Sequence, residues 1–281
     1  MTRVDSHHHL WQYEPTGYAW IADDMHVLRR DYDVADFERE AQASRIDASI
    51  VVQARQVLAE NDALLDAAAR STVVAAVVGW VDLRARDVGD VLDRYAAHAA
   101  FRGVRHIVQA EPAGFMDDPR FNEGIAHVTA HGLVYDFLIT ARQLPEAIRL
   151  VDRHPHQTFV LDHLAKPVIR PTAFDCAWAT DLRALAERPH VSCKLSGLVT
   201  EVQDTDCSPS LLQPYVDVAL DCFGPSRLMM GSDWPVCRLR AEYVDWMTML
   251  HALVGALADD ERAAIRGDTA RRVYALAGHP R

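Results

Sequence analysis

The sequence contains 281 residues, a length that suits one large α/β domain or two small ones. Hydrophobic residues make up 49% of the chain and charged residues 25%, which is the balance of an ordinary soluble globular protein. The formal net charge of −11 argues against a nucleic acid or an anionic membrane as a partner, because either would need a basic face.

The sequence contains no segment typical of export or membrane insertion. The first residues are not followed by the apolar stretch of a secretory signal, and no run approaches the roughly 18 apolar residues of a membrane span. The five cysteines are an odd number, and none belongs to a C-x-x-C pair. We therefore expect a reduced, cytoplasmic protein.

Short apolar runs rich in β-branched residues alternate along the chain with longer amphipathic stretches. This alternation is typical of βα units and a parallel sheet. The predicted strands lie at residues 4–10, 49–54, 73–82, 101–108, 133–139, 158–165, 191–197 and 228–234. The predicted helices lie at residues 61–70, 87–100, 118–131, 143–153, 175–187, 209–222, 241–254 and 259–277.

Eight strand–helix units predict a (β/α)8 barrel, or TIM barrel, that forms a single domain over residues 1–281. An open, doubly wound sheet of eight strands is the structural alternative. No G-x-G-x-x-G sequence follows a strand, which argues against a dinucleotide-binding version of that sheet. Barrels place their catalytic groups at the C-terminal ends of the strands, so polar residues at those ends are the candidates for a site.

The first predicted strand carries Asp5, His7 and His9 at every second position. Residues two apart share one face of a strand, so these three side chains are expected on the same face. Two imidazoles at the mouth of a barrel can grip one metal ion or polarise one carbonyl. Buried, hydrogen-bonded histidines without a catalytic role are the alternative.

The sixth predicted strand ends in Asp162 and His163. An aspartate and a histidine at the end of an apolar strand are costly to bury unless they are used. By alternation, His163 is expected on the same face as Phe159 and Leu161. A structural Asp–His pair that orders the next loop is the alternative.

In the seventh predicted strand, Lys194 alternates with apolar residues and should point into the barrel. A lysine in that position must meet a counter-charge or a substrate. It could bind a substrate hydroxyl or carboxylate, or form a structural ion pair with Asp136 or Asp233.

Asp233 follows the apolar eighth strand and precedes a Trp-Pro turn. A carboxylate there can accept a proton from an attacking water and later deliver it to the leaving group. A capping or turn aspartate is the alternative, but the other candidates favour catalysis. The predicted catalytic residues are Asp233, His163, His7 and His9.

Several residues near the strand ends are predicted to contact a substrate. They are Arg105, Lys194, Gln53, Trp11, Trp20 and Asp136. Arg105 or Gln53 could position a substrate oxygen, whereas the tryptophans could wall a pocket or simply pack the loop after the first strand. The sequence has no G-x-S-x-G elbow and no P-loop, which argues against a serine nucleophile and a nucleotide site.

Four segments together resemble the amidohydrolase superfamily, and within it the amidohydrolase-related branch that contains sugar lactonases. The segments are residues 5–11, 162–167, 194–198 and 231–235. They occur in the expected order and cover most of the chain, and they are most similar to hydrolases of L-fuconolactone and L-rhamnonolactone. The resemblance implies a (β/α)8 barrel that hydrolyses a lactone ester.

The sequence departs from the metal-dependent members of the superfamily on the fourth and fifth strands. Those members place a histidine, a glutamate or a modified lysine there, whereas this chain has Arg105 and His106, then Tyr135 and Asp136. We therefore expect no binuclear metal centre.

A single zinc ion remains chemically sensible. His7, His9 and Asp233, with or without His163, offer three or four N and O ligands, and such a set with water makes a catalytic zinc site. Metal-free catalysis stays open as well, because related lactonases can work without metal and a lactone needs less activation than an amide.

These features predict hydrolysis of a small-molecule sugar lactone, L-fuconolactone or a close relative, to the open-chain acid. Asp233 would deprotonate water, and the histidines, directly or through one zinc ion, would polarise the carbonyl. A dicarboxylate lactone would call for several converging arginines, so a neutral sugar lactone suits the sequence better. A zinc-dependent decarboxylase of the same branch and a non-catalytic binding barrel are the alternative functions.

Overall fold

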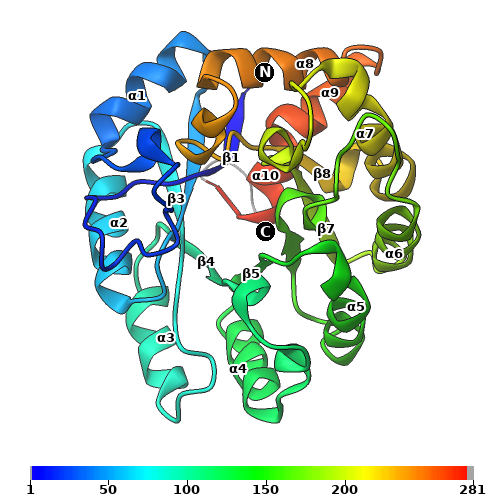
Figure 1. The fold of residues 1–281 in the computed structure, drawn as a ribbon. Coiled ribbons are helices and arrows are strands. Elements are labelled where there is room, and N and C mark those ends of the chain that lie inside the picture. Colours follow the sequence, from blue (N-terminus) through cyan, green and yellow to red (C-terminus); the bar gives the residue numbers. More distant parts are fainter. Residues whose placement is uncertain (1, 277–281) are drawn as a thin grey trace.

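The computed structural model describes residues 2–276 and confirms the predicted barrel. Parallel strands pair in chain order from β1 to β8, and Figure 1 shows the helices as a ring around them. The strands are β1 (Val4–His8), β2 (Ala48–Val52), β3 (Val74–Gly79), β4 (Phe101–His106), β5 (Val134–Phe137), β6 (Phe159–Leu161), β7 (Val191–Leu195) and β8 (Leu228–Met230).

Backbone hydrogen bonds between β1 and the segment after β8 close the sheet. The Asp233 N–H donates to the His7 carbonyl at 2.8 Å, and the His9 N–H donates to the Trp234 carbonyl at 2.6 Å. This closure fixes two predicted catalytic residues from opposite ends of the chain, His7 and Asp233, side by side.

The α-helices within residues 2–276 are α1 (Val34–Ala43), α2 (Leu58–Arg70), α3 (Val88–Ala96), α4 (Pro119–Ala130), α5 (Leu144–Arg153), α6 (Cys176–Ala186), α7 (Pro209–Phe223), α8 (Tyr243–Leu253), α9 (Asp259–Ala263) and α10 (Thr269–Val273). Helix α1 was not predicted; its N-cap is Asp33, whose carboxylate accepts the Asp36 N–H. The predicted last helix is divided by a π-helical turn, Ala264–Asp268, and its final residue, 277, lies outside the described residues.

Several strands end earlier than predicted, because the chain turns where the apolar pattern still continues. Strand β6 stops at Leu161, and His163, Leu164, Ala165 and Lys166 adopt the left-handed backbone conformation with φ between 52° and 57°. Strand β8 stops at Met230 rather than at residue 234. These turns set the direction of the polar side chains that follow the strands, such as His163 and Asp233.

Two apolar layers hold the barrel together. The larger lies between the sheet and the helices, and the smaller fills the barrel interior with side chains such as Val4, Ile50 and Val160. Tyr274, just after α10, belongs to the interior cluster. Arg271 of α10 donates to the Thr2 hydroxyl just before β1, so this helix lies at the end of the barrel where β1 begins. Figure 1 shows α10 near the centre of the ring.

The five cysteines are all unpaired, as a reduced protein requires. Among residues 2–276, every helix is too short or too polar to cross a bilayer.

Candidate active site

A cavity of about 530 Å³ opens at the end of the barrel where the strands finish. Sites for small molecules usually have about 300–1,000 Å³. Its reactive lining comes from separate strand ends: His9 after β1, Arg105 in β4, His163 after β6 and Asp233 after β8. The fourth residue predicted to be catalytic, His7, is fully buried in contact with them. The structure therefore brings all four predicted catalytic residues together.

Strand β1 carries a register shift after Asp5, which changes the side that the following residues face. The Asp5 carboxylate accepts the Ser232 N–H at 2.8 Å and the Tyr243 hydroxyl at 3.0 Å, on the helix side of the sheet. His7 and His9 instead contact each other on the cavity side. The prediction of one common face is correct for the two histidines and wrong for Asp5.

Nitrogen and oxygen atoms of four side chains meet at the cavity floor. The Nε2 atoms of His7 and His9 lie 3.2 Å apart. Asp233 Oδ1 lies 3.4 Å from His9 Nε2, 3.8 Å from His7 Nε2 and 3.7 Å from His163 Nε2. None of these side chains is more than 6% exposed, so their mutual interactions are only weakly screened by water.

Neighbouring groups fix the orientation of two of the imidazoles. His9 Nδ1 lies 2.7 Å from the Val52 carbonyl oxygen, so it donates there and Nε2 faces Asp233. His163 Nδ1 lies 2.7 Å from the Ser196 hydroxyl. The prediction that His163 shares a face with the apolar residues of β6 is wrong, because the left-handed turn after Leu161 redirects it into the cavity.

Burial and neighbouring charge set the protonation states of the cluster. Burial lowers the pKa of His163 to about 4 and holds the pKa of His7 well below its usual range, so both rings are neutral near pH 7. Burial alone would raise the pKa of Asp233, but His163, His9 and His7 outweigh it and hold that pKa below its usual range. An ionised carboxylate among neutral imidazoles can accept a proton or bind a cation.

A fully buried ion network lies beneath the cavity floor. Lys194 Nζ is 2.5 Å from Asp136 Oδ2 and 3.0 Å from Asp162 Oδ1. Arg105 Nη1 is 3.0 Å from Asp162 Oδ2. Lys194 therefore points into the barrel as predicted, and the alternative in which it pairs with Asp136 is confirmed.

Asp162 holds the centre of this network, although its sequence pattern did not place it among the catalytic candidates. Its Oδ1 also lies 3.3 Å from His7 Nδ1. Burial alone would raise the pKa of Asp162, but Lys194, His7 and Arg105 outweigh it and keep that pKa well below its usual range. The sequence signal was an acidic residue that directly follows an apolar strand.

The structure separates the residues predicted to contact substrate into two groups. Arg105 and Trp20 line the cavity. Lys194, Asp136 and Gln53 are fully buried below it. Lys194 pairs with Asp136, and Gln53 Nε2 donates to the Arg105 carbonyl, whereas Gln53 Oε1 has no hydrogen-bond partner among the described residues. Trp11 is not among the residues that line the cavity; its ring packs edge-on against the ring of Trp20, with centroids 5.9 Å apart.

Further polar side chains reach the cavity from the loops after β2, β4, β6 and β7, and the sequence did not single them out as site residues. They are Gln56, Gln109, Lys166, Thr200 and Glu201. Lys166 Nζ lies 3.6 Å from Glu201 Oε1, and burial raises the pKa of Glu201. Lys166 lies in segment 162–167, one of the four that carry the family resemblance. The only sequence signal of the other four is that each is a polar residue a few positions after a strand, which most loop residues share.

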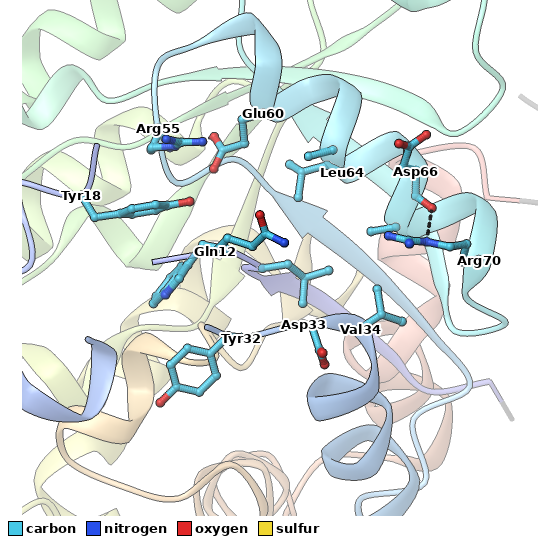
Figure 2. Close-up of a pocket in the computed structure, with 14 residues that line it drawn as sticks. Gln12, Tyr18, Tyr32, Asp33, Val34, Arg55, Glu60, Leu64, Asp66 and Arg70 are labelled. Atoms are coloured by element: carbon cyan, nitrogen blue, oxygen red, sulfur yellow. Dashed lines mark hydrogen bonds between the residues drawn. The ribbon is translucent and has the colours of Figure 1, made fainter. Parts of the chain in front are cut away.

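A second, smaller cavity of about 250 Å³ lies behind the loop after β1. Figure 2 shows Tyr18, Arg55 and Glu60 directed toward one another across it, with Gln12 beside them. The Arg55 guanidinium stacks 4.8 Å from the centroid of the Tyr18 ring. None of the histidines described above lines this cavity, so the larger one is the candidate active site.

The sequence model of the amidohydrolase family, described as "Amidohydrolase", matches residues 4–276. The chain belongs to the amidohydrolase family. It is 41% identical over 287 aligned residues to a Burkholderia multivorans protein named L-fucono-1,5-lactonase, with 98% of this chain and 96% of that protein covered. A second protein of that name, from Burkholderia ambifaria, is 36% identical with the same coverage.

A solved amidohydrolase structure from Burkholderia multivorans, described with bound zinc, superposes with a TM-score of 0.94. It is 41% identical and covers 98% of this amidohydrolase and 100% of that chain. The overall fold described above is therefore shared with that structure over nearly the whole of both chains.

The donor atoms of this amidohydrolase fit one zinc ion. Zinc binds N and O ligands at about 2.0–2.2 Å, so the ligands of a tetrahedral ion lie about 3.3–3.6 Å apart. The Nε2 atoms of His7 and His9 and the Asp233 carboxylate are separated by 3.2–3.8 Å and are all buried. His163 Nε2 lies 3.7 Å from the same carboxylate oxygen but falls outside this group, so the three-residue form of the predicted ligand set is the one that fits.

Proposed function

We propose that this amidohydrolase hydrolyses a sugar lactone, L-fucono-1,5-lactone or a close relative, to the open-chain acid. The observation that carries the proposal is the ionised Asp233 carboxylate at the floor of the cavity. Its Oδ1 lies within 3.8 Å of the Nε2 atoms of His7, His9 and His163. The two relatives named L-fucono-1,5-lactonase support the substrate class, since 98% of this chain aligns with each.

In the proposed reaction, Asp233 accepts a proton from a water molecule while the water oxygen bonds to the lactone carbonyl carbon. The carbonyl π-electrons move onto oxygen and form a tetrahedral oxyanion. The bond from carbon to the ring oxygen then breaks, and Asp233 returns its proton to that oxygen as the hydroxyl of the acid. The Arg105 guanidinium lines the cavity and is a donor beside the developing charge.

His7, His9 and Asp233 would hold a zinc ion at the cavity floor, where it would supply Lewis-acid polarisation of the lactone carbonyl. The protein's own contribution is to keep these groups dry and oriented. The Val52 carbonyl holds His9 and the Ser196 hydroxyl holds His163.

The cavity walls suit a neutral, polyhydroxylated ring. Gln56, Gln109 and the Lys166–Glu201 ion pair offer both donors and acceptors to sugar hydroxyls. Arg105 is the one arginine among the residues that line the cavity, whereas a dicarboxylate lactone would call for several converging arginines. We therefore assign substrate contacts to the lining residues, and supporting roles to Lys194, Asp136 and Gln53 beneath them.

The test is the variant Asp233→Asn, which keeps the shape of the side chain and removes its basicity. Loss of a general base typically lowers the rate by about 10²–10⁴-fold. Turnover of a panel of aldonolactones is followed by acid release with a pH indicator, with and without a chelator. Asp260→Asn, on the exposed surface of α9, is the matched control and should keep wild-type activity.

Near-wild-type turnover by a folded Asp233→Asn protein would remove Asp233 from the mechanism. Failure of the wild-type protein to hydrolyse any lactone of the panel would overturn the proposed function itself.

A further inference from the structure

The side chains that line the larger cavity differ in polarity from one side of the barrel mouth to the other. The strands pair in chain order and the segment after β8 bonds to β1, so the loops surround the mouth in the same order. The loop after β1 and the segment after β8 are therefore neighbours. Their apolar side chains in the cavity, called the apolar wall below, are Trp20, Met25, Val236 and Leu239.

Three side chains of the apolar wall are supported from behind. Met25, Val236 and Leu239 are partly buried and pack against the main hydrophobic core. Val236 and Leu239 begin and end a short 3₁₀ helix, which lies against the turn His26–Leu28 that follows Met25. The two loops thus form one continuous surface.

Trp20 extends this surface with an aromatic ring. It is 40% exposed, although it is a large apolar side chain, and it lines the cavity. Its ring packs edge-on against buried Trp11, whose Nε1 donates to the Arg30 carbonyl at 2.9 Å. The indole of Trp20 is therefore supported on its inner side, and its exposed side is available to a molecule in the cavity.

The loops after β6 and β7 give the cavity a charged side. They contribute Thr200 and the pair of Lys166 and Glu201, whose Nζ and Oε1 atoms lie 3.6 Å apart. The loops after β2, β4 and β5 mix polar and apolar side chains. Substrate hydroxyls can therefore find donors and acceptors on every side of the mouth except at the apolar wall.

The apolar wall is a poor surface for a sugar hydroxyl. The side chains of Met25, Val236 and Leu239 offer no hydrogen-bond donor, and their only acceptor is the weak thioether sulfur of Met25. A hydroxyl placed there would lose water without gaining a partner, which is costly, whereas a methyl group placed there gains from leaving water. The wall therefore suits a sugar carbon that carries no oxygen.

We propose that the apolar wall receives the terminal methyl group of a 6-deoxy sugar lactone and selects that lactone over its 6-hydroxy counterpart. The inference rests on the proposed lactone hydrolysis and adds which residues determine specificity. The wall adjoins the groups proposed for catalysis, because His9 begins the loop that carries Trp20 and Asp233 lies three positions before Val236.

The decisive experiment compares L-fuconolactone with L-galactonolactone of the same ring size. The two differ only at the last carbon, which is a methyl group in the first and a hydroxymethyl group in the second. Wild type should have a kcat/KM for L-fuconolactone roughly 10- to 100-fold above that for L-galactonolactone, which is the range that an apolar pocket achieves.

Two variants place a polar group in the wall with the side-chain size nearly kept. Met25→Gln and Leu239→Asn add an amide that can bond the extra hydroxyl, so each should lower the ratio of the two kcat/KM values by about 10-fold. Met249→Gln is the matched control. Met249 on α8 is also partly buried but does not line the cavity, so the control should keep the wild-type ratio.

The outcomes separate this inference from the proposed function. Hydrolysis of both lactones by wild type at equal kcat/KM overturns the inference and leaves lactone hydrolysis intact. An unchanged ratio in Met25→Gln and Leu239→Asn, with circular dichroism showing both folded, also overturns it. If wild type hydrolyses no lactone, the proposed function fails, and the inference that rests on it fails too.

A crystal structure of Asp233→Asn with L-fuconolactone gives a measurement that does not depend on turnover. The methyl carbon should lie within about 4 Å of Met25 or Leu239, which is the distance of an apolar contact. A methyl group directed at Lys166 and Glu201 would contradict the inference.

Discussion

At the scale of single residues, burial decides which side chains act as acids, bases or fixed charges. Asp233 and Asp162 stay ionised because each is surrounded by nitrogen atoms, whereas His163 becomes neutral because it is buried. Glu60 shows the opposite case for a carboxyl group. Its Oε2 accepts the N–H groups of Ala54 and Arg55 at 3.2 and 2.8 Å, yet burial raises its pKa to about 7.

Glu60→Gln should change how stability depends on pH. The pKa of Glu60 is about 7 in the folded protein and returns to its ordinary value of 4.5 on unfolding. The unfolded chain therefore loses the proton first, and the stability of wild type falls as pH rises between these two values. Glutamine cannot ionise, so it has no cost of burying a charge as pH rises. The variant should therefore gain up to about 3 kcal/mol relative to wild type over this range, measured by urea unfolding.

Asp117→Asn is the control for this pH dependence. Hydrogen bonds from Arg149 and Arg153 lower the pKa of Asp117 to about 2, so its contribution is lost only in strong acid. From about pH 5 to about pH 8 its difference from wild type should stay constant. A similarly constant difference for Glu60→Gln would show that Glu60 titrates normally.

At the scale of elements, the turns after the strands place the catalytic groups more than the strands themselves do. The left-handed turn after β6 directs His163 into the cavity, and Gly197 after β7 leaves the room for it. Gly197 has φ +65°, and a Cβ there would lie 2.7 Å from the His163 ring. Two neighbouring turns therefore fit together around one imidazole.

Gly197→Ala should displace His163 and lower kcat/KM of lactone hydrolysis by about 10²-fold, since a misplacement of roughly 1 Å can have that cost. Gly114→Ala is the matched control, because Gly114 also has positive φ (+88°) but a Cβ there would meet nothing within 4 Å. Both variants should lose about 1–2 kcal/mol of stability from backbone strain. Equal kinetics in the two variants would show that the Gly197–His163 contact does not matter.

At the scale of the whole molecule, the two ends of the chain complete the barrel. The hydrogen bonds between His7, His9 and the segment after β8 close the sheet, and Tyr274 near the C-terminus reaches Asp136 inside it. The C-terminal helix thus supports the ion network under the active site. Its role is structural, because the Tyr274 hydroxyl donates to the Asp136 carboxylate that pairs with Lys194.

Tyr274→Phe should destabilise the protein by about 1–3 kcal/mol, because a buried carboxylate loses its hydroxyl donor. Tyr95→Phe is the control, since the Tyr95 hydroxyl donates to the Leu58 carbonyl in the outer layer and its loss should cost about 0.5–1.5 kcal/mol. Urea unfolding of the two variants measures the difference. A smaller loss for Tyr274→Phe than for Tyr95→Phe would contradict the proposed support of Asp136.

The sequence by itself determined the barrel and the main catalytic candidates. Alternating apolar runs and amphipathic stretches reflect local backbone periodicity, so they predicted the strands and most helices. Asp233, His163, His7 and His9 could be selected because ionisable groups at the ends of apolar strands are costly unless used. Helix α1 was missed because its signal, the Asp33 cap, lies in a loop rich in other polar residues.

Only the tertiary structure decided where those side chains point and what surrounds them. A register shift moved Asp5 to the helix side, and a left-handed turn moved His163 into the cavity. Neither feature follows from side-chain alternation, which assumes a regular strand. The sequence left the partner of Lys194 open between Asp136 and Asp233, and only the folded barrel placed Lys194 between Asp136 of β5 and Asp162 after β6.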